Sequence, residues 1–141
     1  MIIADEVQSG FYRSGNFFAY QKFDIVPDII TIAKGMGNGF PVGGIMVSPK
    51  IDPKKGMLGT TYGGNHLACV ASLSVLDYME KNKVKERISK LETYFKDLSS
   101  QVESIKRVKG RGLMLGLEFD FNVSGLRSKL VYEHRIFTGS S

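Results

Sequence analysis

Two residues of opposite charge, Asp5 and Lys34, each follow a short apolar run that is typical of a buried β-strand. Asp5 follows residues 1–4, and Lys34 follows residues 29–33 and precedes a glycine-rich bend. Lysines are rarely buried without a partner, and desolvation lowers the pKa of such an amine, which then serves as a nucleophile and a proton carrier. An acid on a neighbouring parallel strand can hold a ring nitrogen protonated. Pyridoxal phosphate chemistry needs both groups, so a site for this cofactor is one interpretation of the pair, and an ordinary lysine on a loop is the alternative.

A second chemical interpretation rests on the acidic pair Asp5-Glu6, because acids at a strand end can handle magnesium in nucleotide hydrolases. That chemistry also needs a phosphate-binding loop of the form Gly-x-x-x-x-Gly-Lys-Ser/Thr. In this sequence the glycines come after Lys34 instead of before it, and no serine or threonine follows the lysine directly. Solvated acids at an ordinary strand-to-loop transition are the further alternative.

The composition is that of an ordinary globular protein, with 141 residues, 43% hydrophobic and 23% charged. The sequence has no apolar window of about 18 residues and does not start like a signal peptide. The single cysteine, Cys69, excludes an intrachain disulfide and favours a reducing compartment, so we expect a cytoplasmic protein. The two histidines and one cysteine are too few for a usual zinc cluster, and we expect no metal site.

Basic residues are concentrated in one segment, since residues 81–111 hold ten of the 19 lysines and arginines. A basic segment can bind nucleic acid. Apolar residues recur there at alternating steps of four and three, however, which is typical of an amphipathic helix whose lysines face solvent. We therefore expect a solvated helix face, and a nucleic-acid-binding module is the alternative outside the enzymes.

Apolar runs separated by glycine and proline predict the order of the elements. Strands are expected at 1–4, 29–33, 42–47 and 113–119, with another starting at 136, and helices at 66–79, 84–105 and 124–135. The helix at 66–79 is mostly small or apolar, so we expect it to be largely buried. The order predicts an α/β domain over residues 1–80 and part of an α+β domain over 81–141. The pattern at both ends is typical of a fragment of a longer sequence, because one expected strand begins at the first residue and another has barely begun at the last.

The chain resembles the class III (subgroup II) pyridoxal-phosphate aminotransferases in three stretches, ADEVQSGFYRSG, PDIITIAKGMGNGFPVGG and GTTYGGNHLACVAS. Its KGRGLMLGLEF segment is similar to the C-terminal domain of the same family. The acetylornithine and succinylornithine aminotransferases are the most similar group. The resemblance implies the fold-type-I α/β architecture, with part of a large domain whose sheet is mostly parallel and part of a small α+β domain. It also implies that the family's upstream half is absent.

The resemblance implies a role in cofactor binding for each matching residue. Lys34 matches the lysine that forms the internal aldimine and shuttles the proton, and Asp5 matches the partner of the pyridine nitrogen. Val7 stands where an apolar residue packs on a ring face, and Gln8 matches the residue that hydrogen-bonds the phenolic oxygen. Thr61 matches a threonine that reaches the cofactor phosphate from the neighbouring subunit. The implied cofactor-binding set is Asp5, Glu6, Val7, Gln8, Lys34 and Thr61.

The resemblance also implies substrate-binding residues. Thr60 stands where acetylornithine enzymes contact the substrate. The family usually places at the position of Lys109 an arginine that grips the substrate's α-carboxylate, and a lysine cannot offer the same bidentate fork. Lys109 with altered geometry, Arg111 in its place, a different substrate, and a surface role for Lys109 are therefore all open.

The implied reaction is transamination between the terminal amine of an N-acyl-ornithine and 2-oxoglutarate, in arginine biosynthesis. The family forms homodimers whose sites are shared between subunits. Ornithine and 4-aminobutyrate are the alternative amino donors. We expect small-molecule partners, with neither nucleic acid nor membrane, and a fragment that is inactive on its own.

Overall fold

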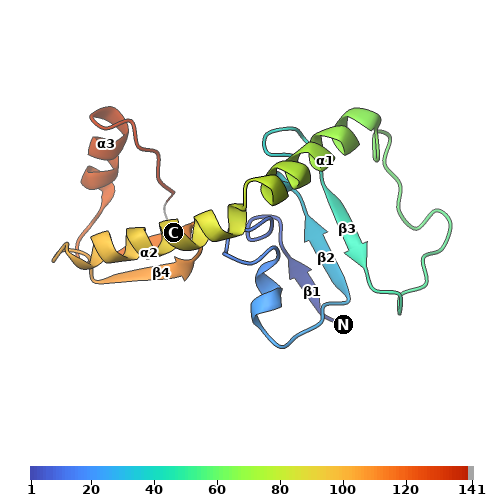
Figure 1. The fold of residues 1–141 in the computed structure, drawn as a ribbon, viewed down its shortest axis with the longest axis horizontal. Coiled ribbons are helices and arrows are strands. Elements are labelled where there is room, and N and C mark those ends of the chain that lie inside the picture. Colours follow the sequence, from blue (N-terminus) through green and yellow to red (C-terminus); the bar gives the residue numbers. More distant parts are fainter. Residues whose placement is uncertain (140–141) are drawn as a thin grey trace.

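The computed structural model describes residues 1–139 and shows two units that are joined where helix α1 (His66–Lys81) meets helix α2 (Val84–Ser100). The N-terminal unit, residues 1–81, holds a three-stranded sheet with α1 beside it (Figure 1). The C-terminal unit, residues 84–139, holds α2, a two-stranded sheet and a short helix. The α/β organisation is the predicted one. The expected domain boundary after residue 80 falls in the last turn of α1 and stays a prediction.

The N-terminal sheet brings two strand ends to one edge. Strand β1 (Ile3–Asp5) pairs in parallel with β2 (Ile29–Ile32), and β3 (Gly44–Val47) pairs with β2 in the antiparallel direction. In the register of the parallel pair, Asp5 lies opposite Thr31. The expected parallel pairing is found between β1 and β2, whereas β3 makes the described part of the sheet mixed.

The core of the N-terminal unit lies under the long connection between β1 and β2. Phe11, Phe18 and Ile30 form its buried centre, and the connection contains the short 3-10 helix η1 (Ala19–Lys22). Phe18 packs edge-on against Phe11 and stacks on Tyr20, with ring centroids 6.0 and 5.9 Å apart. The aromatic residues of this connection therefore supply most of the core that fixes the strand ends.

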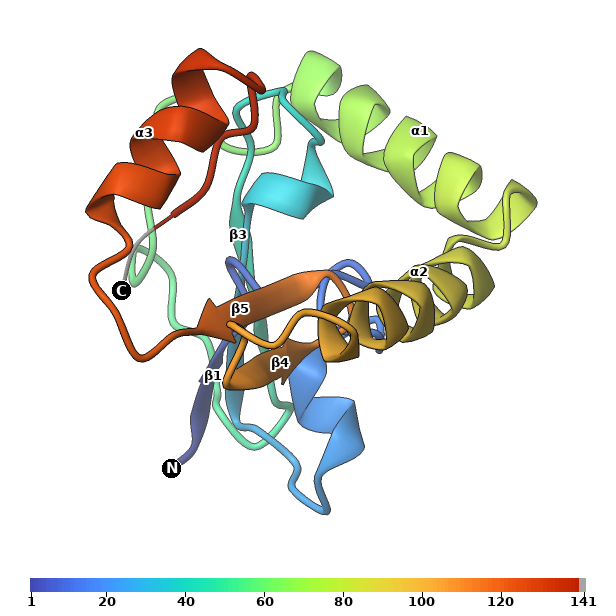
Figure 2. The ribbon, with the colours of Figure 1, turned by 90° about the vertical axis from the view of Figure 1, so that its left-hand side faces the viewer.

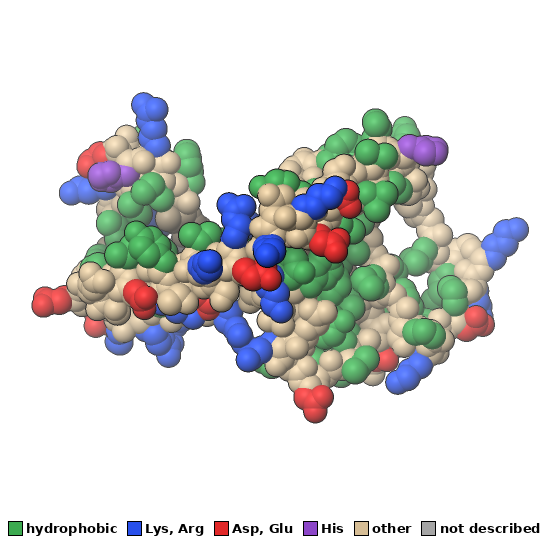
Figure 3. Space-filling view, in the orientation of Figure 1, with side chains coloured by type: hydrophobic (Ala, Val, Ile, Leu, Met, Phe, Trp, Pro, Cys, Tyr) green, Lys and Arg blue, Asp and Glu red, His purple; other side chains and the backbone are tan. Residues whose placement is uncertain are grey.

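Two expectations of burial were wrong for this chain. Strand β1 is not buried, since Ile3 is 59% exposed. Helix α1 is buried only at Ala68 and Ser72, while Leu67 and Val70 are exposed, and apolar atoms cover much of this unit's surface (Figure 3). The sequence pattern indicates which faces are apolar, but among residues 1–139 no further layer packs on the outer faces of β1 and α1.

The C-terminal unit is built on a hairpin of β4 (Arg107–Arg111) and β5 (Met114–Glu118), beside which α2 lies (Figure 2). The prediction missed β4, because its basic residues do not alternate with apolar ones. Helix α3 (Ser124–Tyr132) ends earlier than expected. The strand predicted from residue 136 is not formed up to residue 139, and its continuation lies outside the described residues.

The two units touch where the hairpin turn meets the first connection. The Leu113 N–H donates to the Arg13 carbonyl at 2.9 Å. Gly112 is buried with a φ of 56°, and a Cβ there would lie 2.6 Å from the same carbonyl. Glycine is therefore required at this turn. No helix within residues 1–139 is long and apolar enough to cross a membrane.

Candidate active site

The structure brings Asp5 to the same sheet edge as the lysine-bearing turn. The Asp5 Oδ1 accepts hydrogen bonds from the Val7 N–H at 3.1 Å and from the Thr31 hydroxyl at 2.9 Å. These two bonds, with a lesser contribution from the positive charge of Lys34, outweigh the opposing effect of desolvation and hold the pKa of Asp5 below its ordinary value of 3.8. Asp5 is therefore a carboxylate at neutral pH. Its Oδ2 has no described hydrogen-bond partner and is open to a donor.

Lys34 begins the 3-10 helix η2 (Lys34–Met36), one residue after the end of β2. Its carbonyl accepts the N–H groups of Gly37 and Asn38, at 3.2 and 3.1 Å. Lys34 has a φ of 43°, and a non-glycine residue in this region stores backbone strain that is common at functional sites. The expected burial of the lysine was wrong for this chain, because its side chain is exposed.

An open cavity of about 710 Å³ lies between the two units and includes Lys34 in its wall. Gln8 and Arg13 of the first connection line it, and Arg87 of α2 stands on the opposite side. The lining contains three basic side chains and no acidic one, so the cavity favours an anionic ligand. Sequence reasoning did not single out Arg13 or Arg87, which carry no motif of their own beyond the family stretch and the basic segment.

The residues that follow Asp5 divide into two groups. Gln8 is exposed and lines the cavity, and Val7 is half-buried beside it. Glu6 is only 2% exposed and points into the protein, where its carboxylate accepts the N–H groups of Ala19 and Tyr20. Backbone donors occupy both of its carboxylate oxygens in this structure, and its role in cofactor binding stays a prediction.

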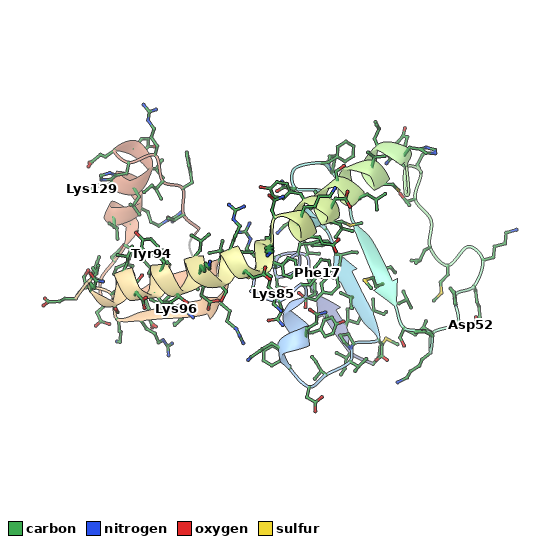
Figure 4. The ribbon with its side chains drawn as sticks, in the orientation of Figure 1. Phe17, Asp52, Lys85, Tyr94, Lys96 and Lys129 are labelled. Atoms are coloured by element: carbon green, nitrogen blue, oxygen red, sulfur yellow. The ribbon has the colours of Figure 1, made fainter. Side chains whose placement is uncertain are left out.

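Thr60 and Thr61 lie on the long loop between β3 and α1, and both are exposed. The loop swings away from β1 and β2 (Figure 1), and Asp52 marks its outer side in Figure 4. Within one chain, neither threonine lines the cavity that holds Lys34. Their roles in phosphate and substrate binding stay predictions.

Lys109 and Arg111 lie on β4, and neither lines the cavity with Lys34. The Lys109 Nζ is 2.9 Å from the Glu118 Oε2. The hydrogen bond from Lys109 and the charges of Lys109 and Arg107 lower the pKa of Glu118 against an opposing effect of burial. Arg111 lines a smaller hollow of about 290 Å³ beside Lys22. The geometry favours the surface role for Lys109, and the substrate roles of both residues stay predictions.

Comparison with known proteins gives a consistent result. The family model "Aminotransferase class-III" matches residues 1–134. The chain is 45% identical over 127 residues to "Alanine--glyoxylate aminotransferase 2 homolog 2, mitochondrial" of Arabidopsis thaliana, covering 84% of this chain and 26% of that protein. It is 43% identical over 122 residues to the acetylornithine aminotransferase of Aquifex aeolicus, covering 85% of this chain and 32% of that protein.

The fold is also that of a solved aminotransferase. The structure of the ornithine aminotransferase from Toxoplasma gondii, described with partial occupancy of PLP at the active site, matches with a TM-score of 0.86 and 30% identity. The match covers 97% of this chain and 34% of that one. The fold-type-I α/β class is confirmed, and the chain spans between a quarter and a third of the length of the relatives described above.

Proposed function

The chain belongs to the class-III aminotransferases, and from this premise we propose that it forms the lysine-bearing part of an enzyme that transfers the terminal amino group of an N-acyl-ornithine to 2-oxoglutarate. The donor is acetylornithine or succinylornithine, and the reaction belongs to arginine biosynthesis in the cytoplasm. The observation that carries this proposal is that Asp5, held as a carboxylate at the end of β1, lies at the same sheet edge as the turn that begins with Lys34 after β2.

The residues present fit pyridoxal phosphate, the cofactor of this family. When bound, the cofactor supplies an aldehyde that a primary amine can engage and a ring that withdraws electrons. Asp5 offers its free Oδ2 to a ring N–H and keeps the negative charge that stabilises a protonated ring nitrogen. The Lys34 Nζ is accessible from the cavity, where it can act as a nucleophile and carry a proton. Gln8 provides an amide at the same wall.

We further propose that the active assembly is a homodimer in which Thr60 and Thr61 serve the partner's site. The loop that bears them leaves the sheet of its own chain, and a hydroxyl together with backbone N–H groups is a suitable ligand for phosphate (Figure 1). One site then draws on two chains. The relatives are about three times longer than this chain, so we expect the 141-residue chain alone to be catalytically silent.

A second candidate function uses a different donor and acceptor. The plant relative at 45% identity carries the name of an alanine–glyoxylate enzyme, and its identity to this chain slightly exceeds that of the acetylornithine enzyme. Transfer from alanine to glyoxylate is therefore the main competitor, and ornithine and 4-aminobutyrate are the other amine donors to compare.

The test is a chimera in which residues 1–134 replace the matching segment of the acetylornithine aminotransferase of Aquifex aeolicus. We expect pyridoxal phosphate to restore glutamate formation from acetylornithine and 2-oxoglutarate. The same chimera with Lys34→Ala is the matched control and should be inactive. A chimera that binds the cofactor but uses only alanine and glyoxylate would contradict the proposed substrate and support the second candidate.

A further inference from the structure

Glu6 is the only charged residue that is fully buried within residues 1–139, and the proposed cofactor contacts do not use it. Its Oε1 accepts the Tyr20 N–H at 2.8 Å, and its Oε2 accepts the Ala19 N–H at 2.9 Å and the Ser9 hydroxyl at 2.5 Å. A buried carboxylate is costly unless donors satisfy it. Three donors do so here, and two of them come from a turn that lies 13 and 14 residues further along the chain.

The backbone of Glu6 is fixed as firmly as its side chain. Its N–H extends the β1–β2 ladder by donating to the Thr31 carbonyl at 3.0 Å, and its own carbonyl accepts the Gly10 N–H at 3.0 Å. A Cβ at Gly10 would lie 2.8 Å from that carbonyl. Glu6 thus ties the start of the first connection both to the sheet and to η1, which lies midway along the connection.

Between Glu6 and η1 the backbone of the first connection is strained. Phe11 and Tyr12 are consecutive non-glycine residues with φ angles of 54° and 65°. Such angles persist only where the surrounding structure fixes them. The Glu6 carboxylate contributes to this constraint, because it joins the start of the connection, before the strained pair, to η1, which comes after the pair.

The strained connection reaches the site at two points. Gln8 and Arg13 line the cavity together with Lys34. The Phe11 side chain packs on Gly35, next to the lysine, since a Cβ at Gly35 would lie 3.0 Å from the Phe11 Cβ. Movement of this connection would therefore displace Gln8 and loosen the support of the turn that presents Lys34.

We propose that Glu6 is a positioning residue, whose buried carboxylate holds the connection so that Gln8 faces the cavity and Phe11 supports the Lys34 turn. The significance of Gln8 and Lys34 in this statement rests on the proposed function. That Glu6 holds the first connection in place is argued from its hydrogen bonds and its burial alone.

The experiment compares the chimera that carries residues 1–134 with its Glu6→Gln and Glu103→Gln variants. Glutamine keeps the shape of Glu6 but turns an NH₂ donor toward a backbone N–H, so at least one bond is lost. Glu103 is exposed and serves as the matched control. Two measurements are made on each protein: amide hydrogen exchange, and the amount of pyridoxal phosphate that borohydride fixes to Lys34, located by peptide mapping.

We expect Glu6→Gln to speed exchange at Ala19 and Tyr20 about tenfold, with parallel increases over residues 8–13, as the loss of a charged hydrogen bond predicts. The share of label at Lys34 should fall severalfold, and Glu103→Gln should leave both measurements unchanged. If Glu6→Gln is poorly folded, Ser9→Ala removes one of the three donors and should shift both measurements in the same direction by a smaller amount.

Faster exchange with unchanged labelling of Lys34 would show that Glu6 is merely structural and would overturn the positioning role. Unchanged exchange over residues 8–13 would overturn it as well. A parent chimera that takes no label at Lys34 would contradict the proposed function instead, and unchanged exchange over residues 8–13 in its Glu6→Gln variant would overturn the positioning role as well.

Discussion

The two units differ in whether they bury a charged side chain. In the N-terminal unit, Glu6 is buried with three hydrogen bonds, and Asp5 accepts two more beside it. In the C-terminal unit, the charges form ion pairs at the surface, such as Lys106 with Asp120 at 2.7 Å and Arg107 with Glu118 at 3.1 Å. Figure 3 shows lysine and arginine side chains at the surface of that unit.

This difference has an energetic meaning. An exposed ion pair contributes about 0–1 kcal/mol, because water already solvates both charges. A buried carboxylate that loses its donors is left with the full cost of desolvation, about 1–3 kcal/mol or more. Geometry is therefore specified tightly around the candidate site and only loosely in the hairpin. The most sensitive substitutions should lie in the N-terminal unit.

The largest expected effect is the loss of one amine in the N-terminal unit. Lys34→Ala should abolish fixation of pyridoxal phosphate at this position in the chimera, because no other lysine lines the cavity. The measurement is reduction with borohydride followed by peptide mapping. Lys109→Ala, in the C-terminal unit, is the control and should keep the label. A pyridoxyl group on another lysine in the wild-type chimera would show that the site has been placed wrongly.

Truncating an aromatic side chain should lower the free energy of unfolding far more in the core of the N-terminal unit than on the surface of the C-terminal unit. Phe18 is 5% exposed, and Phe18→Ala leaves a cavity between Phe11 and Phe17 that should cost about 3–5 kcal/mol. Phe137→Ala in the C-terminal unit is the matched control, since Phe137 is 83% exposed, and it should stay within about 0.5 kcal/mol. Urea unfolding followed by tyrosine fluorescence measures both. Equal losses from the two variants would remove the contrast between the units.

The sequence was sufficient to predict the elements that carry the site. Apolar runs place β1 and β2 next to Asp5 and Lys34, and the periodicity of α2 predicts its start at Val84. The family motif that contains Gln8 predicts it as a site residue, and Gln8 lines the cavity with Lys34. These features are local, so short-range patterns are enough to find them.

Other features depended on contacts between distant segments. The burial of Glu6 depends on hydrogen bonds from the N–H groups of Ala19 and Tyr20, and no local sequence pattern predicts these contacts. Strand β4 is basic and becomes a strand only because β5 pairs with it. The exposure of α1 could not be read from its apolar composition, since burial depends on what covers the helix and not on the helix itself.

The contact between the units offers a third and smaller test. Gly112→Ala places a methyl group against the Arg13 carbonyl and the Gly15 amide in a left-handed conformation, and this should cost about 1–3 kcal/mol. The hydrogen-exchange rate of the Leu113 N–H, which donates to the Arg13 carbonyl, should rise in the same variant. Gly116→Ala has open space around it and is the control. A stable Gly112→Ala protein with a protected Leu113 amide would contradict the contact.

Acid should weaken the same contact. Partial burial alone would raise the pKa of Glu92, which lies on α2 one turn before Lys96 (labelled in Figure 4). Hydrogen bonds from Lys96 and the Gly112 N–H, together with the charges of Lys96 and Arg111, outweigh this effect and lower the pKa of Glu92 below its ordinary value of 4.5. A lowered folded-state pKa means that the stabilisation is complete above about pH 4.5 and is lost as the pH falls through the lower value. Glu92→Gln should flatten this acid dependence of stability, measured by urea unfolding between pH 3 and 6. An unchanged slope would show that Glu92 gains nothing from its partners.

The smallest expected effect concerns the surface pairs of the hairpin. Glu118→Gln removes the acceptor shared by Lys109 and Arg107, yet both cations stay solvated, so the melting temperature should change by less than about 2 °C. The change should shrink further at high salt, because salt screens exposed charges. The comparison is sharpest when Glu118→Gln and Glu6→Gln are measured side by side, since both replace a carboxylate by its amide. If Glu118→Gln proved as damaging as Glu6→Gln, the hairpin would be specified by its charges as tightly as the site is, and the contrast between the two units would be lost.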